Sequence, residues 1–295
     1  MVSRSLSKTF IVFIVTIVSM LGLTMGKVDA KFMQDKATWL WDTTKIVEDE
    51  SGALSFLEGK QVKKLYLQIN SDIASDDYKS FINKATTKGI KVYALDGSAS
   101  WVSADGYKMQ DQLFDWIQSY NENAAATERF SGVHLDVEPY LNSGWSSNQE
   151  KTIESYQALL TRAKGNTEQL QLPLEADMPF WFDEVSYNNQ FGSGLLADWV
   201  IDQVESVSIM AYRDSAKDII KIVEHEINYA KKVNKSIVIG VETGASDEGK
   251  NITFYDNGEA YMNKQLAQVH KQYANKTSYN GFAIHYVDSW MNMKP

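Results

Sequence analysis

The chain of 295 residues contains no cysteine, and this absence excludes several kinds of site. Without thiols there is no disulfide, no thiolate-bound metal, no cysteine nucleophile and no lipidated N-terminal cysteine. Lys and Arg number 29 against 38 Asp and Glu, and no dense basic block occurs, so we expect no binding to nucleic acid. The spacings His-x-x-x-His and the EF-hand loop are also absent, and we expect neither a metal nor another cofactor.

The chain has a single long apolar run, from Phe10 to about Gly26, and the basic residues Arg4 and Lys8 precede it. The segment Val28-Asp29-Ala30 follows it, with small residues where a signal peptidase cleaves. We therefore expect residues 1–30 to be a signal peptide and the protein to be secreted or held at the extracellular surface. The run approaches the length of a membrane span, so an uncleaved anchor is the alternative, and membrane contact is expected through this segment alone.

The composition of the remaining chain is that of a folded domain. Hydrophobic residues make up 44% and aromatic residues 12%, which excludes wholesale disorder. The length suffices for one large domain or two small ones. Because no stretch rich in Pro, Gly or Ser divides residues 31–295, we predict a single domain, and we expect a monomer.

Short β-rich segments alternate with helical patterns along this domain. The predicted strands are 37–42, 64–70, 90–96, 132–138, 171–177, 206–212, 236–242 and 281–286. The predicted helices are 75–88, 108–124, 148–164, 216–233 and 257–275. Strand–helix alternation is typical of parallel βαβ units, and eight units in about 250 residues predict a closed (β/α)8 barrel.

Side chains alternate in character within the predicted strands. In the second strand Leu65 and Leu67 alternate with Tyr66 and Gln68, and the fourth, sixth and eighth strands repeat the pattern. Successive side chains of a barrel strand point alternately inward and outward. We therefore predict that the aliphatic residues face the helices, with Tyr286 on the same outward parity, and that the polar residues face the barrel interior.

Acidic and aromatic residues gather where the predicted strands end. The last inward positions are Trp39, Trp41, Gln68, Asn70, Asp96, Asp136, Glu138, Glu175, Asp177, Tyr212, Glu242 and His285. Barrel enzymes place their active sites at the carboxyl ends of the strands, and carboxylates that converge there raise one another's pKa. Trp101, Trp181 and Trp290 also follow strand ends, and aromatic faces stack on sugar rings. Together these residues indicate a carbohydrate site and favour glycoside hydrolysis, which needs a protonated acid.

The fourth predicted strand carries a resemblance to a known family. Its sequence Ser131-Gly-Val-His-Leu-Asp-Val-Glu138 resembles the strand-four signature Asp-Gly-x-Asp-x-Asp-x-Glu of the family 18 glycoside hydrolases, the chitinase-like barrels. Met210-Ala211-Tyr212 is similar to the family's Met-x-Tyr on strand six, and Trp290 is similar to its Trp after strand eight. Ser131 and His134 replace the first two aspartates of the signature, and Pro139-Tyr140 follows where Tyr-Pro is usual.

The resemblance implies a (β/α)8 fold and hydrolysis of glycans rich in N-acetylated amino sugars, such as chitin, cell-wall glycans or N-glycan cores. The substrate acetamido group would attack the anomeric carbon, with Glu138 as general acid, Asp136 orienting the acetamide and Tyr212 bonding its carbonyl. His134 would take the place of a buried aspartate beside Asp136. The residues expected to bind substrate are Trp41, Gln68, Asn70, Asp96, Tyr140, Asp177, Trp181, Asp214, Glu242, His285 and Trp290.

Two other functions stay open on the sequence. Glu138 and Glu242 end the fourth and seventh strands, where retaining barrel glycosidases of another clan carry their acid/base and nucleophile. Glu138-Pro139 resembles the Asn-Glu-Pro of that clan, with Val137 where the Asn should be. The other function is that of a barrel that binds carbohydrate without cleaving it.

Overall fold

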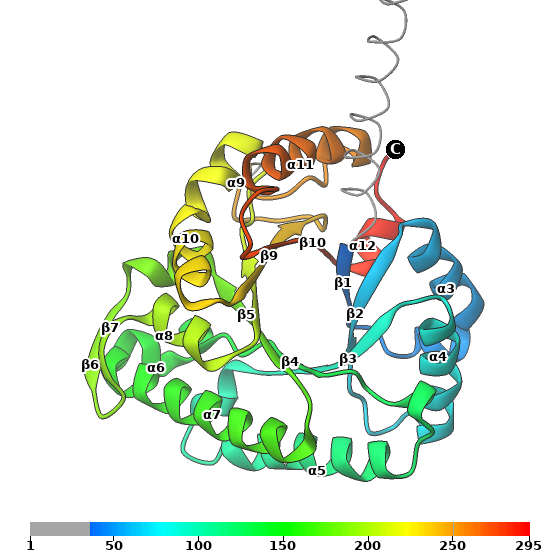
Figure 1. Ribbon diagram of the computed structural model, residues 1–295, viewed down its shortest axis with the longest axis horizontal. Helices are drawn as coiled ribbons and strands as arrows, with labels where there is room; N and C mark the ends of the chain where they lie inside the picture. Colours follow the sequence, from blue (N-terminus) through cyan, green and yellow to red (C-terminus); the bar gives the residue numbers. More distant parts are fainter. Residues whose placement is uncertain (1–35, 250) are drawn as a thin grey trace, which may run out of the picture.

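The computed structural model describes residues 36–249 and 251–295, and it shows a closed barrel of eight parallel strands ringed by helices (Figure 1). The predicted signal peptide and its cleavage site lie outside the described residues. The strand order around the barrel is β1-β10-β9-β8-β5-β4-β3-β2. The predicted single (β/α)8 barrel is confirmed.

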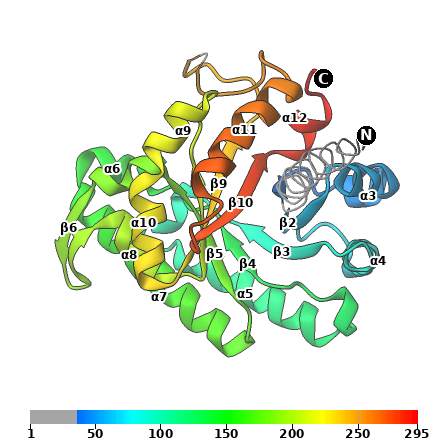
Figure 2. The ribbon, with the colours of Figure 1, turned by 45° about the horizontal axis from the view of Figure 1, so that its top comes forward.

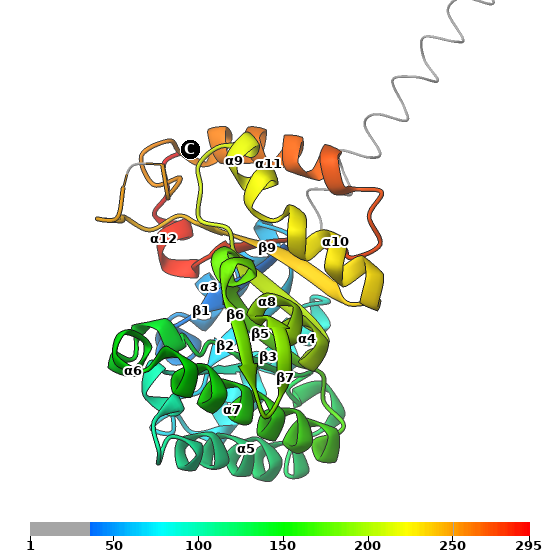
Figure 3. The same cartoon turned by 90° about the vertical axis from the view of Figure 1, so that its left-hand side faces the viewer.

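Each of the eight predicted strands has a counterpart in the barrel, displaced by a few residues at most ends. The barrel strands are β1 (Lys36–Leu40), β2 (Val62–Gln68), β3 (Lys91–Asp96), β4 (Val133–Leu135), β5 (Leu174–Pro179), β8 (Ser206–Met210), β9 (Ser236–Glu242) and β10 (Tyr279–His285). A hairpin of β6 (Ser186–Asn189) and β7 (Gly192–Leu195) forms a separate two-stranded sheet beside the barrel (Figure 3).

The helices cover the outside of the barrel. They are α2 (Lys45–Glu48), α3 (Glu50–Gly59), α4 (Ser75–Thr87), α5 (Tyr107–Glu122), α6 (Ser143–Ser147), α7 (Gln149–Leu170), α8 (Leu196–Gln203), α9 (Ala216–Ile222), α10 (Glu224–Val233), α11 (Glu259–Tyr273) and α12 (Val287–Met291). Short 3-10 turns are η1 (Ala99–Val102), η2 (Ala126–Glu128), η3 (Pro139–Leu141) and η4 (Phe180–Glu184). The helix predicted over 216–233 is two helices, because Val223 leaves the helical conformation between α9 and α10.

Local chemistry explains where several helices begin and end. Helix α7 starts after Asn148, whose side chain accepts a hydrogen bond from the Lys151 N–H. It ends at Gln171, which takes the left-handed conformation with φ of 56°. In the same way α9 starts after Ser215, which accepts from the Asp218 N–H. Helices α9 and α11 lie side by side on the barrel (Figure 2).

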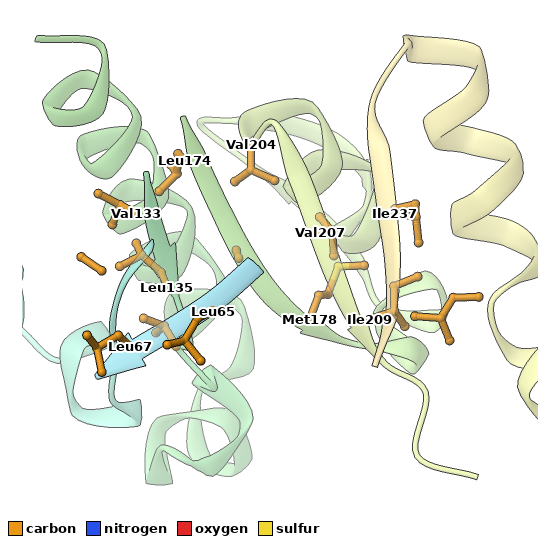
Figure 4. Packing of buried hydrophobic residues seen from close by; sticks show 14 of the residues in the cluster. Leu65, Leu67, Val133, Leu135, Leu174, Met178, Val204, Val207, Ile209 and Ile237 are labelled. Atoms are coloured by element: carbon orange, nitrogen blue, oxygen red, sulfur yellow. The ribbon is translucent and has the colours of Figure 1, made fainter. Parts of the chain in front are cut away.

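The core is divided by the barrel wall into two layers. The outer layer lies between strands and helices and is almost wholly apolar, as Leu65, Leu67, Val207 and Ile209 show (Figure 4). The inner layer is smaller and more polar, and its apolar members are Ala37, Trp39, Tyr66, Tyr93, Leu95, Val238 and Ala283. The predicted parity is therefore confirmed within the strands.

Tyr286 is the exception to this parity. We predicted that its side chain faces the helices, but it packs against the inner layer. Strand β10 ends at His285, so strand alternation no longer fixes the direction of the next side chain. Within the described parts of the chain, no helix has the length and apolar character that a membrane span requires.

Candidate active site

The carboxyl ends of β4, β5, β8 and β9 bring together the acids that the sequence analysis selected. Tyr212, which follows β8, marks their meeting point. Burial raises the pKa of its hydroxyl well above the ordinary value, and the charges of Glu242, Asp177, Asp136 and Glu138 raise it further. Four carboxyl groups from three strands therefore lie within electrostatic reach of one phenol.

Glu138 lies immediately beyond β4, at the start of the turn η3. Burial raises the pKa of its carboxyl group, and the negative charge of Asp177 raises it further. The hydroxyl of Tyr140 donates a hydrogen bond to Glu138 Oε1 and favours the charged form, but burial prevails. An acid whose pKa is raised suits the protonation of a leaving group.

Asp136 lies two residues before Glu138, on the same side of the chain. Its pKa is raised well above the ordinary value, first by burial and then by the charges of Asp177 and Glu138. His134 acts in the opposite direction. Asp136 Oδ1 is buried, and no hydrogen-bond partner for it occurs within residues 36–249 and 251–295. Burial and the two neighbouring negative charges thus favour the protonated form of Asp136.

Below these acids the barrel interior holds a row of charged side chains. His134 Nε2 lies 2.9 Å from Asp177 Oδ2, and His134 Nδ1 lies 3.7 Å from Glu175 Oε2. Lys64 donates to the other oxygen of Glu175. Burial opposes a charge on His134, but Asp177 and Glu175 outweigh it and raise its pKa to about 9. The row therefore alternates cation and anion, which is how buried charges are tolerated.

Aromatic rings fix the orientation of this row. The Trp39 indole N–H donates to Asp177 Oδ2 at 2.9 Å. The ring of Tyr66 stacks on His134 with centroids 3.7 Å apart, and the Tyr66 hydroxyl lies 3.1 Å from Ser208 Oγ. Trp39 is 1% exposed, so it is part of the interior and does not offer a face to a ligand.

A second row of hydrogen bonds crosses the opposite side of the site. Trp41 Nε1 donates to His285 Nε2 at 3.0 Å, and His285 Nδ1 lies 2.7 Å from Glu242 Oε2. Because an indole N–H can only donate, His285 Nε2 accepts, and its proton is on Nδ1 facing Glu242. Glu242 Oε1 accepts from the backbone N–H groups of Thr243 and Gly244. These donors fix the orientation of the Glu242 carboxyl group.

An aromatic wall stands next to Glu138 and consists of Tyr140, Trp145 and Trp181. The ring centroids of Tyr140 and Trp181 are 5.1 Å apart, and those of Trp145 and Trp181 are 5.9 Å apart. All three side chains are partly exposed. Trp145 was missed by the sequence analysis because it lies on the short helix α6, beyond the reach of strand periodicity.

The remaining polar residues of the expected set lie around the rim. Gln68 Nε2 donates to Asp96 Oδ1 at 3.2 Å, and burial raises the pKa of Asp96. The Asn70 side chain is occupied locally, since its oxygen accepts from the Asp72 N–H. Asp214 follows β8, and its backbone N–H donates to the Asn251 carbonyl, so it borders the loop before α11.

Trp290 does not lie where the resemblance implies. It is 1% exposed and belongs to the outer layer, where its ring meets Phe56 edge-on at 5.4 Å. Its indole N–H donates to Glu259 Oε1 at 3.1 Å. The residue sits on α12, after β10 has ended, and that helix turns it towards α3 and α11. Trp101, on η1, is likewise buried, at 2% exposure.

The donor sets described here do not suit a metal ion. In the described ranges, no group of three or more His, Cys, Asp or Glu side chains has an arrangement that could hold one.

Comparison with known proteins finds solved structures of similar fold and no match by sequence. No protein-family model matches the chain, and no curated protein matches it. A chitinase from Chromobacterium violaceum superposes with a TM-score of 0.54 at 12% identity, over 88% of this chain and 97% of that one. A family 18 chitinase from Cycas revoluta, solved as a mutant with (GlcNAc)4, gives 0.51 at 12% identity over 87% and 96%.

A β-glycosidase from Pyrococcus horikoshii also shares the fold, with a TM-score of 0.52 at 9% identity over 86% of this chain and 84% of that one. The resemblance to the chitinase-like barrels is thus confirmed for the fold, and it is remote. At 9–12% identity these solved structures show the fold of the chain.

Proposed function

We propose that this chain is a glycoside hydrolase for glycans of N-acetylated amino sugars, with Glu138 as general acid. The observation that carries the proposal is the pair Asp136 and Glu138, two acids with raised pKa that follow β4 and whose charges reach the Tyr212 hydroxyl. A chitinase with the same fold was solved with (GlcNAc)4, which supports this substrate class.

The expected reaction is substrate-assisted and retains the anomeric configuration. Glu138 gives its proton to the glycosidic oxygen as that bond breaks. The carbonyl oxygen of the substrate acetamide attacks the anomeric carbon and forms an oxazolinium ring, while Tyr212 donates to that oxygen and Asp136 holds the acetamide N–H. Glu138, now a carboxylate, takes a proton from the water that opens the ring.

The aromatic wall supplies the binding surface for neighbouring sugars. Tyr140, Trp145 and Trp181 extend from the acid on one side of the site. Aromatic faces can stack on sugar rings without any charge, which suits a neutral polymer. Tyr140 would take part in both sugar binding and catalysis, because its hydroxyl also donates a hydrogen bond to Glu138.

The decisive variant is Glu138→Gln, which keeps the size of the side chain and removes its proton. We expect the release of reducing ends from chitin oligosaccharides to fall by about 10²- to 10⁴-fold, the usual contribution of a general acid, while binding persists. Glu205→Gln is the matched control, because Glu205 is exposed at the other end of the barrel, just before β8.

A de-N-acetylated oligosaccharide of the same length should resist cleavage, because it lacks the attacking carbonyl. Unchanged turnover in Glu138→Gln would refute the role of Glu138. Binding without cleavage in the wild-type protein, across acetylated glycans, would instead support a carbohydrate-binding barrel.

The two-glutamate mechanism is the competing proposal, because Glu242 ends β9 and its charge and that of Glu138 both reach the Tyr212 hydroxyl. Both oxygens of Glu242 already accept hydrogen bonds, from two backbone N–H groups and from His285. This leaves less accepting capacity for attack on carbon and suits a positioning role better. In Glu242→Ala, azide rescue that yields an inverted glycosyl azide would establish Glu242 as the nucleophile.

We also propose that the protein acts outside the cytoplasm, as the basic start and apolar run of residues 1–30 predict. The N-terminal sequence of the protein recovered from its host would test cleavage after Ala30.

A further inference from the structure

The hairpin of β6 and β7 stands outside the barrel, where β6 contacts α7 and β7 contacts α8 (Figure 3). Between β6 and the first turns of α7 lies a hollow of about 530 Å³. Amides, hydroxyls, one carboxylate and one aliphatic side chain line it, from Gln149, Glu150, Ile153, Ser186, Tyr187, Asn188 and Asn189. None of these residues belongs to the group of acids around Tyr212 or to the aromatic wall.

Side-chain hydrogen bonds fix the tip of the hairpin against α7. Asn189 Nδ2 donates to Gln157 Oε1 at 2.7 Å, and Gln157 is fully buried. Gln190 Nε2 donates to Glu154 Oε1 at 2.8 Å. Ile153 is 2% exposed, so the hollow reaches down to the buried surface of α7. Its walls are therefore held in place before a ligand binds, which lowers the entropic cost of binding.

The edge of β6 that faces α7 presents peptide groups that β7 does not bind. Among the described residues, β6 pairs with β7 alone. The Leu196 N–H donates to the Val185 carbonyl, and hydrogen-bonded pairs alternate with non-bonded pairs along an antiparallel ladder. The peptide groups of Ser186 and Asn188 therefore point away from β7, and both residues line the hollow. Each of them brings one backbone donor and one backbone acceptor.

This lining fits a neutral ligand that carries amide and hydroxyl groups. Side-chain amides and peptide groups both donate and accept hydrogen bonds, as sugar hydroxyls do. An acetamido group is itself a peptide-like amide, so its N–H and carbonyl can pair with a free strand edge as an added strand does. Of the described residues that line the hollow, none is Lys, Arg or His, and Glu150 is a carboxylate. An anionic ligand is therefore disfavoured.

Both walls of the hollow adjoin the aromatic wall along the chain. Gln149 begins α7 shortly after Trp145 on α6. Ser186 begins β6 shortly after Trp181 on η4. The rings of the two tryptophans have their centroids 5.9 Å apart. A glycan that extends from Glu138 over these rings therefore reaches the hollow with its more distant sugars.

We propose that the hollow between β6 and α7 is a second binding site for N-acetylated glycan, which holds a sugar some way along the chain from the bond at Glu138. The choice of ligand rests on the proposed function. The acetamido group of that sugar pairs with the free peptide groups of Ser186 and Asn188, and the side chains of Gln149 and Asn188 bind its hydroxyls. The site strengthens the binding of long glycans and has no effect on short ones.

The first test measures hydrogen exchange of the hairpin amides in Glu138→Gln, which binds glycan without cleaving it under the proposed function. The hexasaccharide of N-acetylglucosamine should slow the exchange of the Ser186 and Asn188 amide hydrogens by at least about fivefold, because these groups gain hydrogen bonds. The disaccharide should leave their exchange unchanged, because it does not extend beyond the site at Glu138.

The second test is calorimetry on Gln149→Ala/Asn188→Ala, made in Glu138→Gln. Both side chains are exposed, so the change does not disturb the core. The variant should bind the hexasaccharide about tenfold more weakly, because it loses two hydrogen bonds, and bind the disaccharide as its parent does. Gln169→Ala is the matched control, since Gln169 is exposed at the other end of α7, and it should change neither affinity.

Three results would overturn the proposal. One is a hexasaccharide that binds Glu138→Gln and leaves the hairpin amides unprotected. Another is equal affinity for the hexasaccharide in the double variant and its parent. The third is protection of these amides by a neutral extended peptide and not by the hexasaccharide, which would make the edge of β6 a strand-addition site.

The second site and the proposed function can fail separately. Protection of the hairpin amides in a protein that cleaves no glycan would keep the site and refute the function. Cleavage that depends on Glu138, with the hairpin amides unprotected, would keep the function and refute the site. A protein that binds neither oligosaccharide would refute both.

Discussion

The two faces of the barrel strands differ in chemical character, although neighbouring residues of the same strand form them. On β8, Ile209 points into the outer layer, which is almost wholly apolar, and Ser208 points into the interior, where its hydroxyl lies 3.1 Å from the Tyr66 hydroxyl. On β2, Leu65 and Lys64 divide in the same way. The outer face stabilises the fold by burying carbon, and its contribution does not depend on pH. The inner face holds charges whose burial is costly unless each one is paired.

This difference indicates where the molecule can be altered without touching its chemistry. Apolar packing tolerates small losses, because cost scales with the volume removed. A network of buried charges does not, because the loss of one member leaves an uncompensated charge in the interior. The interior row from Lys64 to Asp177 is therefore the most sensitive part of the barrel.

The largest effect on stability is expected when Lys64, at one end of this row of buried charges, is replaced. Lys64→Met leaves Glu175, whose side chain is 4% exposed, with His134 as its remaining counter-charge. We expect a loss of about 3–5 kcal/mol in the free energy of unfolding, measured with urea. Lys63→Met is the control, since Lys63 is exposed on the same strand, and it should change stability by less than about 0.5 kcal/mol.

The double variant Lys64→Met/Glu175→Gln sharpens the result. It removes both charges, so it should recover part of the loss. Equal stability of Lys64→Met and the wild type would mean that the interior charges are not coupled in this way.

The outer layer also contains a buried carboxyl group, which predicts a dependence of stability on pH. Glu226 on α10 is 0% exposed, and neither carboxyl oxygen has a hydrogen-bond partner within residues 36–249 and 251–295. Burial raises its pKa from 4.5 to about 8. The folded state therefore binds this proton more tightly than the unfolded state, and stability is greatest below the unfolded pKa and decreases as pH rises towards 8.

Glu226→Gln should remove this dependence. Between pH 5 and 9 the contribution of Glu226 to the free energy of unfolding should fall by on the order of 4 kcal/mol in the wild type. The variant should lose much less over the same range and be the more stable protein at pH 9. Denaturation curves at the two pH values measure both quantities, and parallel losses in the two proteins would exclude Glu226 as the cause.

The sequence predicts the residues within the barrel strands better than those beyond the strand ends. Strand periodicity separates the two faces, so it predicted the barrel and the inward direction of Asp136, Glu138 and Tyr212. Register then places Glu242 beside His285 on neighbouring strands β9 and β10. Periodicity does not reach beyond a strand, which is why the burial of Trp290 on α12 was not predicted.

Loop and helix geometry accounts for the other differences. The hairpin of β6 and β7 has exposed and partly exposed side chains in a Gly- and Asn-rich segment, which gives no apolar alternation to detect. Trp145 joins the aromatic wall through packing against Trp181 and Phe182, a contact that depends on where η4 lies relative to α6. The residues that form the aromatic wall could therefore be identified only from the tertiary structure.

The smallest effects come from a pair of adjacent residues that test the two faces directly. Ser208→Ala removes the partner of the buried Tyr66 hydroxyl and should cost about 1–3 kcal/mol in the free energy of unfolding. Ile209→Val removes one methylene from the outer layer and should cost about 0.5–1.5 kcal/mol. Glycan turnover should distinguish the two variants more clearly than the free energy of unfolding does. Tyr66 stacks on His134, so Ser208→Ala should lower glycan turnover, whereas Ile209→Val should leave it unchanged. Equal turnover in both variants would show that the interior row does not depend on the orientation of Tyr66.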